Sequence, residues 1–171
     1  MSEAGMIAAT EQPVSEMDCQ QLCRLVIEAV HRIDHGLADT YHEMFTHDGE
    51  LIIPATTSNG KVIVPETTLR GRKAIQEWGQ GIVRSGSLGT IRHVCGNMRF
   101  IADGPDAAVG RTVLTVYQGT GPGSPTTLPW SVGEDHDRFV RTEQGWRIAS
   151  RRWVELFARP AVSNPGEGRS E

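Results

Sequence analysis

Two residues in the 171-residue sequence combine a proton-transferring side chain with a setting that suits its use, Asp34 and His93. Asp34 lies in the last turn of an amphipathic segment, four residues after Val30 and seven after Ile27, at the edge of the apolar stripe. The negative end of the helix dipole and partial burial both disfavour the ionised form of a carboxylate there, and such a carboxylate suits a general base. A solvated acid that helps to end the helix is the alternative interpretation.

His93 lies in a segment with the period-two pattern of a strand. Its face of the strand mixes apolar and polar groups, as a pocket wall does, and imidazole transfers protons near neutral pH. A hydrogen-bonded structural histidine is the alternative. The face of His93 carries Ile91, His93, Cys95, Asn97 and Arg99, whereas Val94, Met98 and Phe100 share the other face, which we interpret as core.

Periodicity predicts the elements that position these two residues. Ser15 can cap a long amphipathic helix that ends near Gly36, and the period changes from helical to two at residue 90. The order of elements predicts an α+β domain in which three helices and a curved, mostly antiparallel sheet enclose a pocket. We expect helices over 15–36, 37–45 and 71–83, a hairpin of strands 51–53 and 62–64 around Asn59-Gly60, and long strands over 91–102, 107–118, 130–141 and 146–157.

Composition limits the class of protein. Lys and Arg number 17 against 21 Asp and Glu, a net charge of −4, which gives no support to a nucleic-acid or anionic-membrane binder. No segment approaches the roughly 18–20 apolar residues of a membrane span, and the first residues lack the pattern of a secretory signal. The three cysteines are an odd number and favour reduced thiols and a cytoplasmic location. We predict one domain over 15–159 between flexible tails, 1–14 and 160–171.

Other chemistries lack their motifs. His31 and His35 have the i, i+4 spacing of metal ligands, but the string HRIDH lacks the Glu of HExxH. The loop string GTGPGS has neither the Lys-Ser/Thr of a phosphate-binding loop nor a strand–glycine–helix context, and we interpret 119–129 as a flexible connection or a lid. No GxSxG nucleophile motif occurs. We therefore expect no metal and no cofactor, which leaves proton transfer, hydration or dehydration.

Several short strings, in this order, carry a resemblance to a known family. The sequence resembles the SnoaL-like proteins of the nuclear-transport-factor-2-like superfamily, which includes scytalone dehydratase, ketosteroid isomerase and the polyketide cyclases. The strings are IDHG at 33–36, MFTHDG at 44–49, LRGRKAI at 69–75, IRHVCGN at 91–97, DRFVR at 137–141 and GWRI at 145–148. The resemblance implies a cone-shaped, cystatin-like α+β barrel and a homodimer formed through the open sheet.

The resemblance also implies roles for individual residues. It places His93 opposite Asp34 as a catalytic pair that takes a proton beside a carbonyl and assists the departure of hydroxide. The string at 133–137, GEDHD, lacks the tyrosine that relatives often carry, which argues against scytalone itself as the substrate. Further candidates for substrate binding are His31, Tyr41, Trp78, Asn97, Tyr117 and Arg152.

The sequence thus predicts an acid–base enzyme, a dehydratase acting on a small hydrophobic carbonyl compound. An isomerase or polyketide-type cyclase is an alternative, because both begin with abstraction of a proton next to a carbonyl. A ligand-binding module without catalysis and a structural partner like the β subunits of ring-hydroxylating dioxygenases also stay open, the latter because the fold and an Arg-His pair like Arg92-His93 are shared.

Overall fold

The computed structural model describes residues 11–58, 61–86, 91–119 and 129–158. The first helix, α1, spans Glu16–Asp34, and the Ser15 hydroxyl caps it by accepting a hydrogen bond from the Asp18 amide at 3.1 Å. Gly36, with φ of +75°, then lets the chain turn away. Before α1, the Ala102 amide donates to the Gln12 carbonyl at 2.9 Å, so the chain is already fixed along the sheet edge at residue 12.

The second helix is shorter than the sequence suggests. A 3₁₀ helix, η1, spans Ala38–Met44, and strand β1 begins at once and spans Phe45–Ile53. The helix ends before Asp48-Gly49, and strand β1 runs through both residues. A Cβ on Gly49 would come within 2.9 Å of the Phe45 Cβ and 3.1 Å of the Ile148 carbonyl, so this glycine serves close packing and not a turn.

A hairpin does flank residues 59–60, but its first strand is not 51–53. Strand β2 (Thr56–Ser58) pairs with β3 (Lys61–Val64). Leu51–Ile53 instead pairs with β4 (Thr67–Arg70) on one side and with β8 (Gly145–Ala158) on the other. The expected partner of 51–53 is therefore corrected. The apolar run at 51–53 belongs to the main sheet, where its side chains reach the interior.

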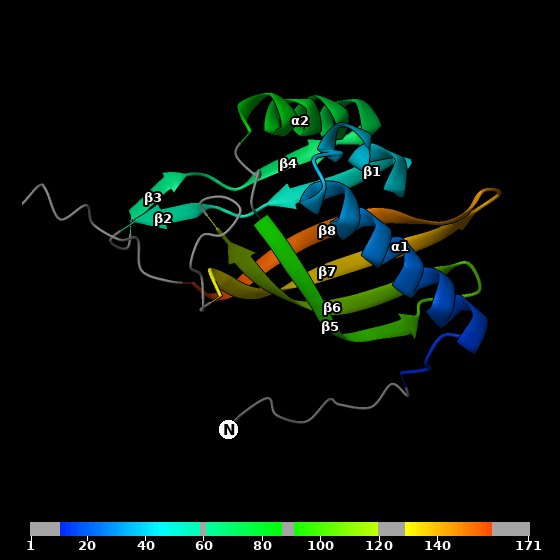
Figure 1. Ribbon diagram of the computed structural model, residues 1–171. Helices are drawn as coiled ribbons and strands as arrows, with labels where there is room; N and C mark the ends of the chain where they lie inside the picture. The colour runs from blue at the N-terminus through cyan, green and yellow to red at the C-terminus, as the bar shows by residue number, and fades with distance from the viewer. Residues whose placement is uncertain (1–10, 59–60, 87–90, 120–128, 159–171) are drawn as a thin grey trace, which may run out of the picture.

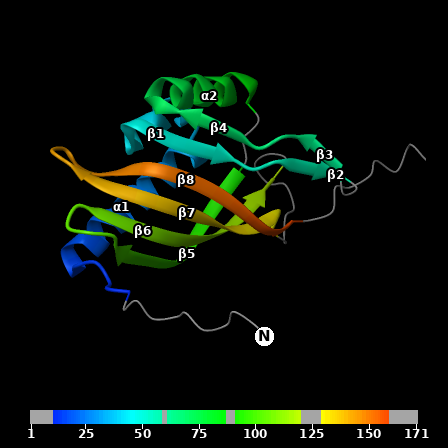
Figure 2. The same ribbon diagram turned by 180° about the vertical axis from the view of Figure 1, so that it is seen from behind.

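The remaining strands agree with the sequence to within a residue. They are β5 (Ile91–Ala102), β6 (Ala107–Gln118), β7 (Ser131–Thr142) and β8 (Gly145–Ala158). The main sheet has the order β4-β1-β8-β7-β6-β5 and is antiparallel except for the parallel pair β1 and β8. Figures 1 and 2 show that this sheet is strongly curved and that the helices cover one of its faces. The predicted fold class, α+β with three helices on a curved, mostly antiparallel sheet, is confirmed.

The core lies between that face and the helices. Leu22, Val26 and Ala29 on one face of α1 are fully buried in a cluster with residues of the sheet, among them Phe45, Phe139 and Ile148. Helix α2 (Gly71–Ser85) packs on η1 and contributes Ile75, which is also fully buried. The Asp18 carboxylate accepts hydrogen bonds from Arg141 at 2.6 Å and from the Trp146 indole at 3.0 Å, which join the first turn of α1 to β7 and β8.

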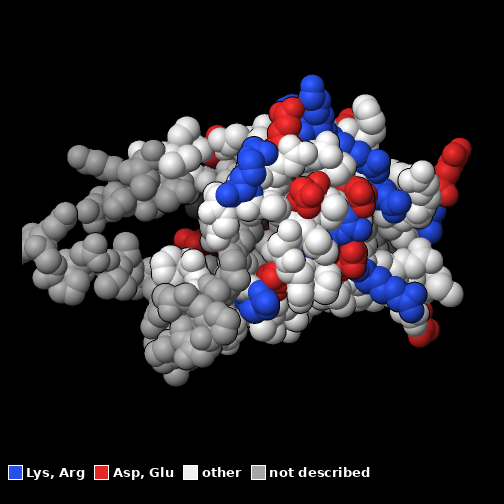
Figure 3. Space-filling model, turned by 45° about the horizontal axis from the view of Figure 1, so that its top comes forward, with Lys and Arg blue, Asp and Glu red and all other residues white. Residues whose placement is uncertain are grey.

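The surface carries charges of both signs. On the face shown in Figure 3, acidic and basic side chains are interspersed and form no continuous basic area. Within the described ranges, no helix is long and apolar enough to cross a membrane. Cys19, Cys23 and Cys95 are all free thiols.

Candidate active site

Asp34 and His93 meet at the point where α1 ends beside β5. The Nδ1 atom of His93 lies 2.6 Å from Asp34 Oδ1, and the His93 backbone amide donates to Oδ2 at 2.9 Å. Asp34 is 8% exposed. Next to the pair, the Arg92 guanidinium donates to the Asp34 carbonyl at 2.6 Å and so satisfies an otherwise unpaired group at the helix C-terminus. One carboxylate thus holds both the ring and the backbone of His93.

These contacts determine the tautomer of the neutral His93 ring. An ionised carboxylate can only accept hydrogen bonds, so Nδ1 carries the proton and Nε2 keeps its lone pair. His93 also lines a cavity, whereas Asp34 stands behind it and does not. The pair therefore offers the cavity an oriented basic nitrogen.

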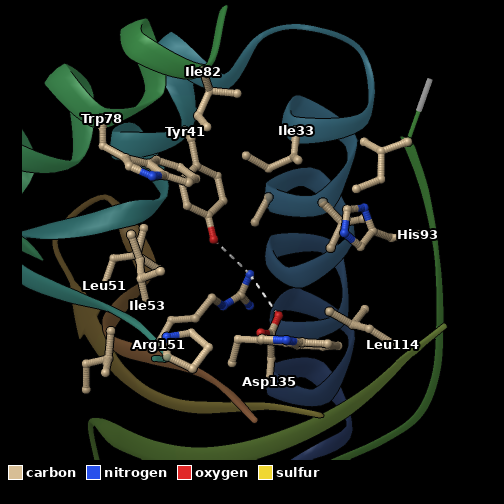
Figure 4. A pocket seen from close by; sticks show the side chains of 16 residues that line it. Ile33, Tyr41, Leu51, Ile53, Trp78, Ile82, His93, Leu114, Asp135 and Arg151 are labelled. Atoms are coloured by element: carbon tan, nitrogen blue, oxygen red, sulfur yellow. Dashed lines mark hydrogen bonds and ion pairs between the residues drawn. The ribbon is translucent and has the colours of Figure 1, made fainter. Parts of the chain in front are cut away.

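The cavity has a volume of about 250 Å³ and lies between the helices and the concave face of the sheet. Its walls are mostly apolar, and its polar groups are those of Tyr41, His93, Asp135 and Arg151, which approach it from different elements (Figure 4). A small apolar cavity with a few converging polar groups is the usual form of a small-molecule site. The apolar lining consists of Ala29, Val30, Ile33, Leu51, Ile52, Ile53, Pro54, Trp78, Ile82, Ile91, Leu114 and Trp153.

A buried charge cluster that the sequence analysis missed forms another part of the wall. Arg151, 3% exposed, donates from Nε to Asp137 Oδ1 at 2.8 Å and from Nη2 to Asp137 Oδ2 at 2.6 Å. Its third nitrogen, Nη1, donates to the Tyr41 hydroxyl at 3.3 Å and lies 3.4 Å from Asp135 Oδ2. Figure 4 shows these two contacts as dashed lines at the cavity. The cluster joins η1, β7 and β8 and brings one carboxyl group to the cavity.

Burial shifts the ionisation of two members of the cluster. It raises the pKa of Asp135 to about 7; Arg151 opposes this shift and the Asp137 carboxylate adds to it. Burial likewise raises the pKa of Tyr41 to about 12, so the phenol keeps its proton at neutral pH. The cavity therefore contains an unusually weak acid, Asp135, besides the imidazole of His93.

A bulge in β8 explains why Arg151 and not Arg152 faces the cavity. Trp146 and Ile148 point into the core, and strict alternation would bring Arg152 to the same face. The pairing with β7 slips by one residue between Arg138 and Phe139, which turns Arg151 inward. Arg152 lies on the outer face and pairs with Glu66 at 2.5 Å. The structure does not place the predicted Arg152 in the cavity.

A second bulge has the same effect on β5. Asn97 has φ of +46°, and the pairing with β6 shifts between Gly96 and Arg99. Ile91, His93 and Cys95 face inward before the bulge, and Met98 and Phe100 after it. Asn97 is therefore exposed and not in the cavity. The expectation that Val94 belongs to the core is wrong, because its side chain is 57% exposed.

The other predicted site residues divide into two groups. Tyr41 and Trp78 line the cavity, with their ring centroids 6.0 Å apart. His31 lies on the exposed side of α1, where it stacks on His35 at 3.9 Å. Tyr117 belongs to the outer face of β6, since its neighbours Val116 and Leu114 alternate inward. The structure brings neither His31 nor Tyr117 to the cavity.

Some sequence-based expectations concern segments outside the described residues. The proposed lid, 119–129, lies outside the described residues except at its two ends, and so do the tails before residue 11 and after residue 158. Among the described residues, no three His, Cys, Asp or Glu side chains come together as a metal-ligating group.

Comparisons with known proteins agree with this architecture. Residues 17–152 match the family described as SnoaL-like domain. No curated protein matches the sequence at a significant level. The family resemblance inferred from short motifs is thereby confirmed.

Solved structures with the same fold include three from Novosphingobium aromaticivorans. An NTF2-like protein with a cystatin-like fold shares 23% identity and a TM-score of 0.66 over 82% of each chain. A candidate scytalone dehydratase shares 16% identity and a TM-score of 0.61 over 91% of this chain and 96% of its own. The β subunit of a candidate aromatic-ring-hydroxylating dioxygenase shares 16% identity and a TM-score of 0.64 over 83% and 91%. At these identities the similarity concerns the fold alone.

Proposed function

The chain belongs to the SnoaL-like domain family, and we propose that it is a cofactor-independent acid–base enzyme that dehydrates a small hydrophobic carbonyl compound bearing a hydroxyl group. One observation carries the proposal: the Asp34 carboxylate holds the His93 ring at 2.6 Å, and the ring lines an apolar cavity. Removal of a proton from a bound substrate requires only these two groups, the base and the carboxylate that orients it.

In the proposed reaction, His93 Nε2 removes a proton from the carbon beside the carbonyl. Asp34 keeps the ring in place and stabilises the imidazolium that forms, as an orienting carboxylate does in other histidine bases. The Tyr41 hydroxyl accepts its hydrogen bond from Arg151, so its own proton is available to a substrate carbonyl oxygen. The new carbon–carbon double bond forms as the carbon–oxygen bond to the hydroxyl breaks.

The lining of the cavity supports a neutral, hydrophobic substrate. A volume of about 250 Å³ suits a single ring or a short chain. Among the described residues, Arg151 alone brings a guanidinium to the cavity, and Asp137 already matches it through two hydrogen bonds, so it leaves little charge to attract an anion. Isomerisation and aldol-type cyclisation share the first proton transfer, and they differ from dehydration in the product alone.

We also propose that two copies of the chain associate through the outer face of the sheet. Three valines on this face, Val94, Val109 and Val140, are exposed on three strands. Val109 and Val140 lie on adjacent strands, because Ala107 pairs with Val140 and Val109 with Arg138. These valines would contribute apolar area to a contact between two copies.

The test uses a probe, the aldol of benzaldehyde and acetone, whose dehydration gives benzylideneacetone. We expect the full-length protein to release this product, and Asp34→Asn and His93→Gln to lose at least 100-fold in rate. Asp48→Asn and His47→Gln, both at exposed positions of β1, are the matched controls. Undiminished rates in both active-site variants would refute the mechanism. Binding of the probe without any product would favour a ligand-binding module. Copurification of the protein with a larger chain would favour a structural partner.

A further inference from the structure

We propose that Asp135 is the acid of this site: it holds a proton at neutral pH and delivers it to the hydroxyl group that leaves the substrate. The inference rests on the proposed dehydration and adds a second catalytic residue to it. Asp135 lies on β7, whereas His93 lies on β5, and Figure 4 shows the two side chains reaching the cavity from different walls. A base and an acid on separate walls can act on two different atoms of one small substrate.

Two carboxyl groups share Arg151 unequally. Asp137 takes two short hydrogen bonds from the guanidinium, at 2.8 and 2.6 Å. Asp135 has only the longer 3.4 Å contact with Nη1, and Tyr41 shares the same nitrogen. Because the bidentate pair already neutralises the guanidinium, Asp135 is the second carboxyl group for a single positive charge.

The surplus carboxyl group is also buried. Asp135 is 5% exposed, and Asp137 and Arg151 are buried as deeply. If both carboxyl groups were ionised, the cluster would carry a net negative charge in an apolar interior, which is costly. Binding one proton removes that cost. Asp135 is the better site for the proton, because Asp137 would lose its bidentate pair by accepting it.

The other groups that face Asp135 do not supply a compensating charge. Tyr41 on η1 and Cys95 on β5 have pKa values raised by burial, so both are neutral at pH 7. The positive charge of Arg151 on β8 and the negative charge of Asp137 on β7 cancel each other. Burial raises the pKa of Asp135 itself to about 7, which agrees with the count of charges. An acid with a pKa near the working pH is also the most effective proton donor.

The reaction then balances without an external reagent. His93 Nε2 takes the proton from carbon, the carbon–oxygen bond to the leaving hydroxyl breaks, and that oxygen receives the Asp135 proton and departs as water. His93 ends as imidazolium and Asp135 as carboxylate. Transfer of one proton from His93 to Asp135 through solvent restores both groups.

Carbon-13 NMR of the full-length protein labelled at aspartate carboxyl groups tests whether Asp135 holds the proton. The signal absent from Asp135→Asn should titrate with a midpoint near pH 7, well above the reference value of about 4 for an aspartate side chain. An Asp135 midpoint below pH 5 would overturn the proposal.

Asn is the isostere of a protonated Asp, so Asp135→Asn should also keep the urea midpoint of the wild type at pH 7. A large loss would show that Asp135 is an ionised partner of Arg151.

Two reactions separate the acid from the base. Asp135→Asn should lose at least 100-fold in the rate of dehydration of the benzaldehyde–acetone aldol. The same variant should exchange the methyl protons of acetophenone with deuterium oxide at a rate within tenfold of wild type, because exchange needs only the base. His93→Gln should lose both reactions. Glu134→Gln, a neighbouring carboxylate of β7 that pairs with His136 at 2.8 Å outside the cavity, is the control and should lose neither.

Each other outcome also decides the question. Wild-type rates of dehydration in Asp135→Asn, or loss of proton exchange in that variant, would contradict the role as acid. Failure of the wild-type protein to exchange acetophenone protons would count against the proposed base and the function that depends on it. The NMR titration would still decide whether Asp135 holds a proton.

Discussion

His93 is held at two atoms by one carboxylate, and this double contact explains how a histidine on a long strand acquires a fixed orientation. The side chain of Asp34 accepts from the ring at 2.6 Å and from the backbone at 2.9 Å. A rotation of the ring would break the first bond, and a slip of the strand would break the second. The end of α1 and strand β5 are therefore aligned by the same residue that makes the base competent.

At the residue scale, adjacent arginines provide a matched comparison. Arg151→Met should lower the free energy of unfolding by roughly 3–5 kcal/mol, because it leaves the Asp137 carboxylate buried without its countercharge. Arg152→Met removes only an exposed pair with Glu66 and should cost less than about 1 kcal/mol. Urea unfolding at neutral pH measures both. Equal losses would contradict the assignment of Arg151 as the buried partner.

Residue types indicated part of the site but not all of it. The sequence predicted Asp34, His93, Tyr41 and Trp78, and the structure brings these four to the cavity or directly behind it. It did not identify Arg151, Asp135 or Asp137, although Asp135 and Asp137 stand two apart on a predicted strand. Strand periodicity groups residues by face but does not say which face is inside when both contain polar side chains.

At the element scale, two bulges decide which side chains enter the cavity. Each one adds a residue to its strand and reverses the alternation beyond it. Asn97 and Arg152 were predicted as site residues on strands that were assumed regular, and each lies outward because of a bulge. The dipeptide Gly96-Asn97 was the available signal for β5, since both residue types tolerate a left-handed backbone. Nothing comparable marks the bulge at Ala149.

The contact between α2 and η1 depends on one glycine. A Cβ on Gly79 would fall on the carbonyl oxygen of Ala38, so Gly79→Ala must move α2 away from η1. We expect a loss of roughly 1–3 kcal/mol in the free energy of unfolding, in the range of an overpacked core. Gly81→Ala, two residues on, meets nothing closer than the Arg84 side chain at 4.0 Å and should be neutral or gain up to about 1 kcal/mol. Thermal unfolding of the pair checks this; a destabilised Gly81→Ala together with an unchanged Gly79→Ala would contradict it.

The start of α1 gives a prediction for acid stability. Hydrogen bonds from Arg141 and Trp146 lower the pKa of Asp18 from 3.8 to about 2. A carboxyl group with a lowered folded-state pKa stabilises the protein above its unfolded value and loses that contribution as the pH falls. The difference in unfolding free energy between wild type and Asp18→Asn should therefore shrink as the pH falls from 5 to 2. Urea titrations at several pH values measure it, with the exposed Asp48→Asn as control. A difference that grows on acidification would refute this account.

At the scale of the whole molecule, the curved sheet exposes apolar side chains on its convex side. If this face joins two copies, Val109→Asp together with Val140→Asp should convert a dimer into a monomer in light scattering coupled to gel filtration, because charged groups would be buried in the contact. Val62→Asp, at an exposed valine on β3 outside the main sheet, should leave the mass unchanged. A wild-type protein that elutes as a monomer at micromolar concentration would contradict the proposed association.

The overall fold was more accessible from the sequence than the site. Helical periodicity over α1 and α2 and period two over the four long strands determined the class and the order of layers. The pairing of Leu51–Ile53 was not predictable in the same way, because β1 pairs with β8 across nearly a hundred residues of sequence. Contacts of that range depend on the packing of the whole sheet, and local patterns do not record them.

The decisive step of the proposed reaction is the removal of a proton from carbon by His93, oriented by Asp34. Exchange of acetophenone methyl protons with deuterium oxide, followed by proton NMR, tests this step directly, because it needs no leaving group. We predict exchange above the uncatalysed rate for wild type and for His47→Gln, and at least a 100-fold loss for both His93→Gln and Asp34→Asn with folding intact. Exchange at the wild-type rate in His93→Gln, or none in the wild-type protein, would contradict the account.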